Sequence, residues 1–315
     1  MSQEQCCQLV LIAHRSLLTA FMTESDLIQL RRTKWRLDGN PIRTIEEARA
    51  FIESVGFCLM YPVRPPMPVP TFIGAFAGSD DRLPTWQHAF SDPRAVDATS
   101  LMVRLLRERS AYEANIFDEN NAFLIAASAF PFFYALVGER NPKLAPKPGP
   151  RSPYSELACD TFELIRRDGP IAKEKLQAAL GKSISLPALD KALGELFAKL
   201  RITRVDYKAK EGGSFWDVLY RWSPEAVREG INISVAQALS ALVTKYLDCV
   251  VAAEPAELEI FLGNFVARSR VKEAINALLA ARELSFVHVG GKSMLQITPA
   301  KEPAVTTTRP YRAAK

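Results

Sequence analysis

The C-terminal half of the chain contains an internal repeat, and this repeat restricts the possible folds more than any other feature of the sequence. The segment Asp190–Tyr207 (DKALGELFAKLRITRVDY) aligns without a gap with Lys272–Val289 (KEAINALLAARELSFVHV), 82 residues further along. The same offset aligns Leu176 with Leu258 upstream. Self-similarity at a fixed offset indicates that one structural unit occurs twice.

Each copy is expected to begin with three helices. In the first copy the third helix has apolar residues three and four positions apart, from Leu189 to Leu200, as in a helix with one buried face. Gly181 and Gly263 lie where the second helix ends, and a left-handed helix end favours glycine. The two earlier helices are predicted over 155–167 and 172–180 in the first copy, and over 235–250 and 256–262 in the second.

A β-hairpin is expected after the helices, because the hydrophobic period changes there from helical to alternating. Turns with Gly-Gly pairs are predicted at Lys208–Ser214 and Gly290–Lys292, with return strands at Phe215–Trp222 and Ser293–Thr298. Three helices that end in a two-stranded hairpin form a winged helix, which is a helix-turn-helix with a hairpin attached. The sequence therefore predicts tandem winged-helix domains in a mainly α fold with small β-hairpins, of the α+β class.

Proline-rich stretches and changes in composition divide the chain into parts. Asn141–Pro153 (NPKLAPKPGPRSP) contains five prolines, which exclude helix and central strand and favour extended chain. The run MTESD, from Met22, has the capping residues of a helix start. The predicted organisation is a loosely ordered extension (1–21), an N-terminal helical domain that we interpret as a divergent winged helix (22–142), a Pro-rich linker (143–153), two winged-helix domains (154–230 and 231–299) and a disordered tail (300–315).

The composition argues against several classes of protein. Five cysteines without a CxxC pair, and three widely separated histidines, predict neither a metal site nor a disulfide framework, and no cofactor is expected. No stretch approaches the roughly 20 apolar residues that a membrane span requires, so we expect no membrane partner and a cytoplasmic location. The 40 Lys and Arg residues against 35 Asp and Glu give a net charge of +5, which permits a polyanionic partner.

Basic side chains in the predicted winged helices are the candidate contacts to double-stranded DNA. Lys and Arg bind the phosphate backbone by neutralising its charge and releasing counterions. In a winged helix the third helix enters the major groove, while the hairpin tip contacts the backbone or the minor groove. The candidates are Arg31, Arg32 and Lys34 near the N-terminus, Lys191, Lys199, Arg268, Arg270 and Lys272 on the third helices, and Lys208, Lys210 and Lys292 at the hairpin tips.

Several longer segments resemble a known family. These are ERSAYEANIF (Glu108–Phe117), AFPFFYALVG (Ala129–Gly138), DGPIAKEKL (from Asp168) and WDVLYRWSPE (from Trp216). They are similar to the winged-helix DNA glycosylases of crosslink repair, the AlkZ and YcaQ group, and the resemblance covers most of the chain. It implies a DNA-binding scaffold and, in an active member, hydrolysis of the N-glycosyl bond of a damaged base.

The resemblance also implies a catalytic position, which this chain fills with other residues. Members of the family carry Gln-x-Gln or Gln-x-Asp just after an early helix, where the pair positions and activates the water that attacks the sugar. Here the predicted helix Thr44–Val55 ends at Gly56, and Cys58 and Met60 occupy the two positions. A neutral thiol is a poor hydrogen-bond acceptor and a thioether cannot act as a base, so two buried core side chains are the favoured interpretation.

Three functions remain as alternatives. The preferred one is a winged-helix DNA-binding protein, related to the glycosylases of alkylation and crosslink repair, that lacks the usual base-excision chemistry. The second is an active DNA glycosylase with an altered site, and the third is a winged-helix regulator or protein-docking module. For the second, a polar loop offers carboxylates that could reach an active site, namely Asp80, Asp81, Asp92 and Asp97.

Overall fold

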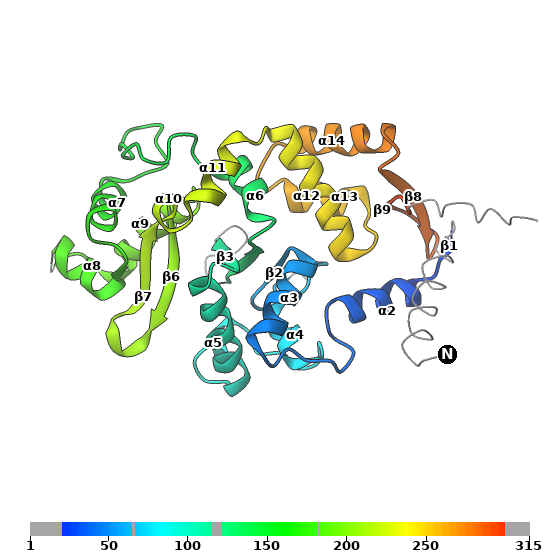
Figure 1. The fold of residues 1–315 in the computed structure, drawn as a ribbon, viewed down its shortest axis with the longest axis horizontal. Coiled ribbons are helices and arrows are strands. Elements are labelled where there is room, and N and C mark those ends of the chain that lie inside the picture. Colours follow the sequence, from blue (N-terminus) through cyan, green and yellow to red (C-terminus); the bar gives the residue numbers. More distant parts are fainter. Residues whose placement is uncertain (1–20, 65–66, 115–120, 182, 300–315) are drawn as a thin grey trace, which may run out of the picture.

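The same order of elements occurs three times along the chain (Figure 1). The computed structural model describes residues 21–64, 67–114, 121–181 and 183–299. Unit 1 (45–126), unit 2 (156–218) and unit 3 (235–297) each contain a helix, a short strand or bridge, two helices and an antiparallel strand pair. In units 1 and 2 the first strand pairs with the last, which is therefore central. In unit 3 a single bridge between Ala253 and Leu295 takes the place of that first strand. This is the element order of a winged helix, and the mostly helical chain with small, mainly antiparallel sheets confirms the α+β class.

Units 2 and 3 correspond to the two copies of the sequence repeat. Three pairs of elements begin 82 residues apart, namely α8 and α13, α9 and α14, and β6 and β8. The elements of unit 2 are α7 (Glu156–Asp168), β5 (Ile171–Ala172), α8 (Lys173–Leu180), α9 (Leu186–Phe197), β6 (Ile202–Lys208), a 3-10 turn η2 (Ala209–Glu211) and β7 (Gly213–Val218). Those of unit 3 are α12 (Val235–Val250), α13 (Pro255–Leu262), α14 (Arg268–Ala280), β8 (Leu284–Val289) and β9 (Lys292–Ile297).

Two local expectations for the repeat were wrong. The first return strand ends at Val218, and Leu219–Trp222 forms a helical turn, α10, because Leu219 packs into a core outside unit 2. Gly263 has a right-handed conformation (φ −61°), since its N–H donates to the carbonyl of Glu259 and continues the helical turn. Glycine is needed there for space, because a Cβ would lie 2.4 Å from that same carbonyl oxygen.

The first helix of unit 1 begins directly after Thr44, which caps it. The Thr44 side chain accepts from the Glu47 N–H and the Glu47 carboxylate accepts from the Thr44 N–H, which forms a capping box. The elements of unit 1 are α3 (Ile45–Val55), β2 (Phe57–Leu59), α4 (Phe72–Ala77), a 3-10 turn η1 (Trp86–His88), α5 (Pro93–Arg107), β3 (Ala111–Ala114) and β4 (Phe123–Ala126). The elements outside the three units are β1 (Phe21–Met22), α2 (Glu24–Lys34), α6 (Phe130–Val137) and α11 (Pro224–Asn232).

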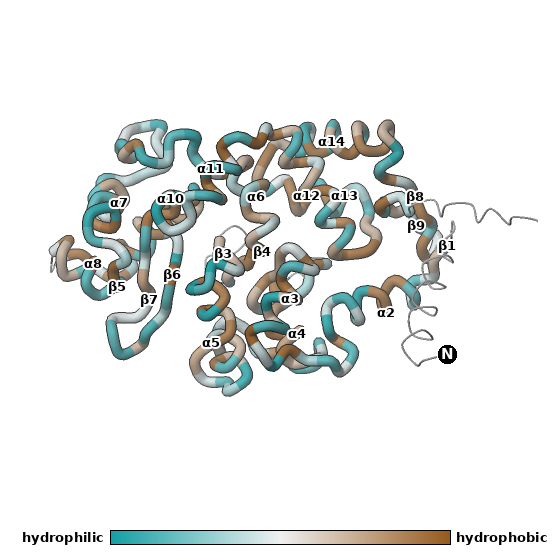
Figure 2. The backbone as a smooth tube through the Cα atoms, in the orientation of Figure 1, coloured by the Kyte–Doolittle hydropathy of each residue, from teal (hydrophilic) through white to brown (hydrophobic). Residues whose placement is uncertain are grey.

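The apolar cores do not follow the order of the units along the chain. Units 1 and 3 share one core, in which the ring of Phe57 on β2 stacks on Phe261 of α13 with centroids 5.0 Å apart. Figure 2 shows hydrophobic residues along β4, the central strand of unit 1, which belongs to this core. Unit 2 has a separate core that contains Phe162 and Trp216. The proposed domain boundaries stay a prediction, and the predicted extension up to residue 20 and tail from 300 lie outside the described residues.

The chain that joins units 1 and 2 is fixed at its start by a buried arginine. The Arg201 side chain is only 1% exposed and donates to the Glu139 carboxylate at 3.1 Å. It also donates to the backbone carbonyls of Asn141 and Leu144. Because a buried guanidinium needs acceptors for its N–H groups, these bonds hold the first residues of the Pro-rich stretch against unit 2.

Gly56 lies where units 1 and 3 meet, between α3 and β2. The Lys245 ammonium of α12 donates to the carbonyls of Glu53 and Ser54, at 3.1 and 3.3 Å, and so binds the C-terminal end of α3. Gly56 has φ +79°, and a Cβ at this position would lie 2.3 Å from Cε of Lys245. The glycine is therefore required both for the backbone conformation and for the passage of the lysine.

We predict that Gly56→Ala lowers the free energy of unfolding by at least about 1 kcal/mol, because alanine disfavours positive φ and would also displace Lys245. Chemical denaturation monitored by circular dichroism measures this. Gly149→Ala is the matched control, since no atom lies within 4 Å of the added Cβ, and it should change stability by less than about 0.5 kcal/mol. Equal stability of the two variants would contradict the described contact.

Candidate nucleic-acid interface

The first turn of α14 presents exposed positive charge without counter-charges. Its N-cap residue is Ala267, which provides no side-chain acceptor, and the first turn contains no acidic residue. Arg268 and Arg270 are exposed, and within the described residues neither guanidinium has a hydrogen-bond or ion-pair partner. Lys272 approaches Glu259 at 3.5 Å and is 60% exposed. Free N–H groups and cations at a helix N-terminus attract anions, so this turn is suited to a phosphate group.

The corresponding helix of unit 2, α9, is less suited to DNA. Ser185 caps its first turn by accepting from the Ala188 N–H. Lys191 on α9 is exposed, whereas Lys199, which the sequence placed on the same helix, lies two residues beyond its end at Phe197 and is partly exposed. Two carboxylates of α9 outweigh the charge of its one lysine. Of these, Asp190 pairs with Lys173 at 2.5 Å, while Glu195 accepts from a backbone N–H. The helix also has no Arg, Asn or Gln, the side chains that most often read base edges.

Two of the three candidate lysines at the hairpin tips form ion pairs. Lys208 pairs with Glu211 at 3.0 Å, and Lys292 pairs with Glu254 at 2.6 Å. The hydrogen bond that Lys292 donates to Glu254 raises the pKa of Lys292, and the charge of the same carboxylate adds to this shift. Lys210 is exposed at the tip of the unit 2 hairpin. Since surface ion pairs exchange readily with water and salt, these lysines can still approach a phosphate.

The three N-terminal candidates bind other groups of this chain. Arg31 donates to the carbonyls of Val250 and Ala252, at 2.8 and 2.7 Å, and burial lowers its pKa. The other two form ion pairs, Lys34 with Asp248 at 2.7 Å and Arg32 with Asp80 at 2.8 Å. Arg31 and Lys34 thus attach α2 to the end of α12, and Arg31 would lose two hydrogen bonds on binding a phosphate. Figure 1 shows α14 and the tip of the β6–β7 hairpin on opposite sides of the molecule, so the candidates do not form one cluster.

Cys58 and Met60 lie inside the core shared by units 1 and 3. Their side chains are 0% and 2% exposed, and Cys58 on β2 pairs with Leu124 of β4. Burial raises the pKa of the Cys58 thiol well above its ordinary value, and the nearby Cys249 adds to this shift. The thiol is therefore neutral at physiological pH and has no path to a sugar in DNA.

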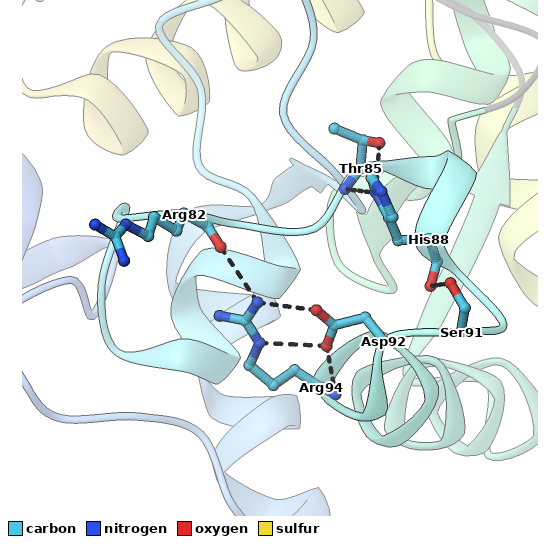
Figure 3. Close-up of polar contacts among 6 residues, drawn as sticks. All are labelled: Arg82, Thr85, His88, Ser91, Asp92 and Arg94. Atoms are coloured by element: carbon cyan, nitrogen blue, oxygen red, sulfur yellow. Dashed lines mark hydrogen bonds and ion pairs between the residues drawn. The ribbon is translucent and has the colours of Figure 1, made fainter.

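The loop carboxylates singled out by the sequence are either occupied by arginines or exposed. Asp92 caps α5 by accepting from the Arg94 N–H at 2.8 Å, and its carboxylate also binds the Arg94 guanidinium (Figure 3). The hydrogen bond from the Arg94 side chain lowers the pKa of Asp92, so this carboxyl stays ionised and is a poor general acid. Asp80 pairs with Arg32, and Asp81 is exposed. Asp97 is also exposed, but it lies on α5 and not in the loop that the sequence predicted.

Sequence analysis missed a buried carboxylate, Glu113 on β3. It is 4% exposed and pairs with Arg204 of β6 at 2.9 Å, so the ion pair connects unit 1 with unit 2. Burial raises the pKa of Glu113 although Arg204 acts in the opposite direction. Glu113 and Cys58 both pair with Leu124, so they share one row of the sheet. The only signal in the sequence was a charged residue inside the strand-like run of residues 111–114.

The three units have the element order of a winged helix, and the first turn of α14 presents an exposed basic surface. The chain belongs to the AlkZ-like DNA glycosylase family, whose family model matches residues 92–312. The solved structure of Streptomyces sahachiroi DNA glycosylase AlkZ is similar in fold, with a TM-score of 0.52 and 13% sequence identity over 85% of this chain and 69% of that chain. No curated protein matches the chain. The family match begins after Cys58 and Met60, so their correspondence to the catalytic pair stays a prediction.

The described residues contain no group of three or more His, Cys, Asp or Glu side chains that could hold a metal ion. No single helix in the same ranges is long and apolar enough to cross a membrane. Only α11 and α12 together reach the required length and composition, with a bend of 111° between them.

We predict that Cys58 and Cys249 resist alkylation in the folded protein, because both thiols are buried and burial raises both pKa values. Peptide mass spectrometry after treatment with iodoacetamide at neutral pH provides the measurement. The partly exposed Cys159 is the internal control and should react, and all three should react in denaturant. Labelling of Cys58 as fast as Cys159 would mean that the thiol reaches solvent.

Proposed function

We propose that this chain binds double-stranded DNA through the first turn of α14 and lacks the usual base-excision chemistry of its family. The observation that carries the proposal is the pair of exposed, unpartnered guanidiniums of Arg268 and Arg270 at an uncapped helix N-terminus. Family membership supplies the class of ligand, since DNA glycosylases act on DNA. In this proposed function the protein recognises damaged or alkylated DNA, and α14 makes the principal contact with the phosphate backbone.

Without a bound anion, the first turn of α14 carries an electrostatic cost in free energy. Cations near a helix N-terminus are repelled by the partial positive charge of the free N–H groups, by a few tenths of a kcal/mol to about 1 kcal/mol each. In contrast, the N-terminus of α12, the first helix of unit 3, has a capping box in which the side chains of Ser234 and Gln237 accept from backbone N–H groups. A phosphate at the start of α14 would accept from the backbone N–H groups and neutralise both arginines. Because such contacts do not depend on sequence, they supply affinity and orientation.

The absence of base excision is supported by the burial of Cys58 and Met60. Hydrolysis of the glycosyl bond requires a group that orients water beside the sugar and stabilises positive charge on it. A neutral buried thiol and a thioether supply neither function. Among the carboxylates discussed above, Glu113 is the one whose pKa is raised, and it already pairs with Arg204.

We expect Arg268→Glu combined with Arg270→Glu to weaken binding to duplex DNA and to reduce the salt dependence of the affinity. Two lost phosphate contacts should lower the slope of log K against log salt by roughly 2. Fluorescence anisotropy across a salt series measures both quantities. Lys191→Glu combined with Lys199→Glu is the matched control, with the same change in net charge on α9 and just beyond its C-terminal end, and should affect the slope less. An equal effect of the two pairs would show that α14 is not the principal contact.

We expect the wild-type chain to release no base from alkylated or crosslinked duplexes above the spontaneous rate, in an assay that detects abasic sites on gels. Base release that disappears with Glu113→Gln would instead favour an active glycosylase with an altered site. If the protein fails to retard DNA even at low salt, a regulator or protein-docking module becomes the better description.

A further inference from the structure

We propose that the cavity between α5 and β6 binds one unstacked nucleobase of a DNA strand. The cavity has a volume of about 230 Å³ and is lined by Phe90, by Tyr207 of β6 and by the side chains of Thr99, Ser100 and Arg107 on α5. It lies on the boundary between units 1 and 2, away from α14. This inference rests on the proposed function, because it identifies which part of a bound DNA the protein would recognise.

Phe90 is the strongest feature of this cavity. Its side chain is 77% exposed, the highest value among the large apolar side chains of the described residues. An aromatic ring in that position gains no burial within the protein, and clustered exposed apolar surface usually marks a binding site. Val96, which is 42% exposed and also lines the cavity, extends the apolar surface.

The backbone around Phe90 is held in one conformation. Thr85 and His88 are joined by a hydrogen bond of 3.0 Å between Oγ1 and Nδ1 (Figure 3). The Asp92 N–H donates to the His88 carbonyl at 3.0 Å. Asp92 is fixed in turn by Arg94 at the start of α5. The exposed ring is therefore presented on a hydrogen-bonded turn, which reduces the entropy lost when a ligand stacks on it.

The second aromatic ring comes from the hairpin of unit 2. The centroids of Phe90 and Tyr207 are 6.1 Å apart, with 34° between the ring planes. A base inserted between two rings requires about 7 Å, twice the stacking distance of about 3.4 Å, so the ligand cannot lie between them. A base would instead stack on the exposed side of Phe90 and contact α5.

The cavity lining also contains polar groups, which suit a nucleobase better than a purely apolar ligand. The Thr99 hydroxyl lies 3.4 Å from the Tyr61 hydroxyl, and the Ser100 hydroxyl donates to the Val96 carbonyl, so both oxygens can still accept. Arg107, paired with Asp206 at 2.7 Å, is 56% exposed and can approach the adjoining phosphate. Two aromatic rings, hydroxyls and an arginine are the combination by which proteins bind unpaired bases. The cavity lies below the roughly 300–1,000 Å³ of most ligand pockets, which favours a single planar ring system.

The test compares two duplexes of the same sequence, one fully paired and one with a single unpaired adenine, by fluorescence anisotropy. We expect the full-length protein to bind the bulged duplex more tightly, by about 5-fold to 100-fold, the range for one stacked base. Phe90→Ala should remove this preference and leave affinity for the paired duplex unchanged, whereas Phe90→Trp should retain it. Trp86→Ala is the matched control, since Trp86 is exposed but does not line the cavity.

Each outcome separates this inference from the proposed function. Binding of the paired duplex without any preference for the bulge overturns the inference and leaves the proposed function standing. Binding of the bulged duplex alone, lost in Phe90→Ala, supports the inference and contradicts binding of paired DNA. An equal loss on both duplexes in Phe90→Ala also overturns the inference. Binding of neither duplex overturns both and favours a protein ligand for this surface.

Discussion

The ring of Phe57 stacks on Phe261 of α13, and the same face of the unit 1 sheet also meets Phe133 of α6. This aromatic packing covers β2 of unit 1 with residues of unit 3. The two units share one core although more than a hundred residues separate them along the chain. Lys245 and Gly56 complete the junction at the end of α3. Because β2 is enclosed on both faces, Cys58 and Met60 cannot reach solvent. The junction that holds the molecule together therefore also decides that these two residues serve packing.

A second junction, between unit 1 and the hairpin of unit 2, uses charge in place of aromatic packing. It is formed by the buried Glu113 and the partly buried Arg204, and within the described residues one Glu113 oxygen and the Arg204 Nε have no hydrogen-bond partner. Burying two charges costs about as much free energy as their attraction returns, so this pair contributes little to stability. Its consequence is geometric, because it fixes the hairpin beside α5 and places Tyr207 next to Phe90. The junction thus creates the cavity for which we propose a nucleobase.

The distribution of partnered and unpartnered cations determines which surface is available to DNA. Arg31, Arg32 and Lys34 form a dense basic run in the sequence, yet all three bind groups of this chain. Arg268 and Arg270 look less prominent in the sequence but face solvent without a counter-charge. Affinity for phosphate depends on which charges are free when the protein folds, and the number of basic residues in a segment does not give this.

The sequence by itself determined the local elements and their repetition. The offset of 82 residues and the change of hydrophobic period located α8, α9 and β6 and their counterparts in unit 3, because these signals depend on neighbouring residues. Likewise, the sequence predicted a helix over Thr44–Val55, and α3 begins one residue later, at Ile45, with Thr44 as its cap. Only the tertiary structure decided that units 1 and 3 share a core, that Arg31 binds the end of α12, and that Phe90 meets Tyr207. Those contacts join residues far apart in the chain, and their energies depend on burial and on partners that no local pattern specifies.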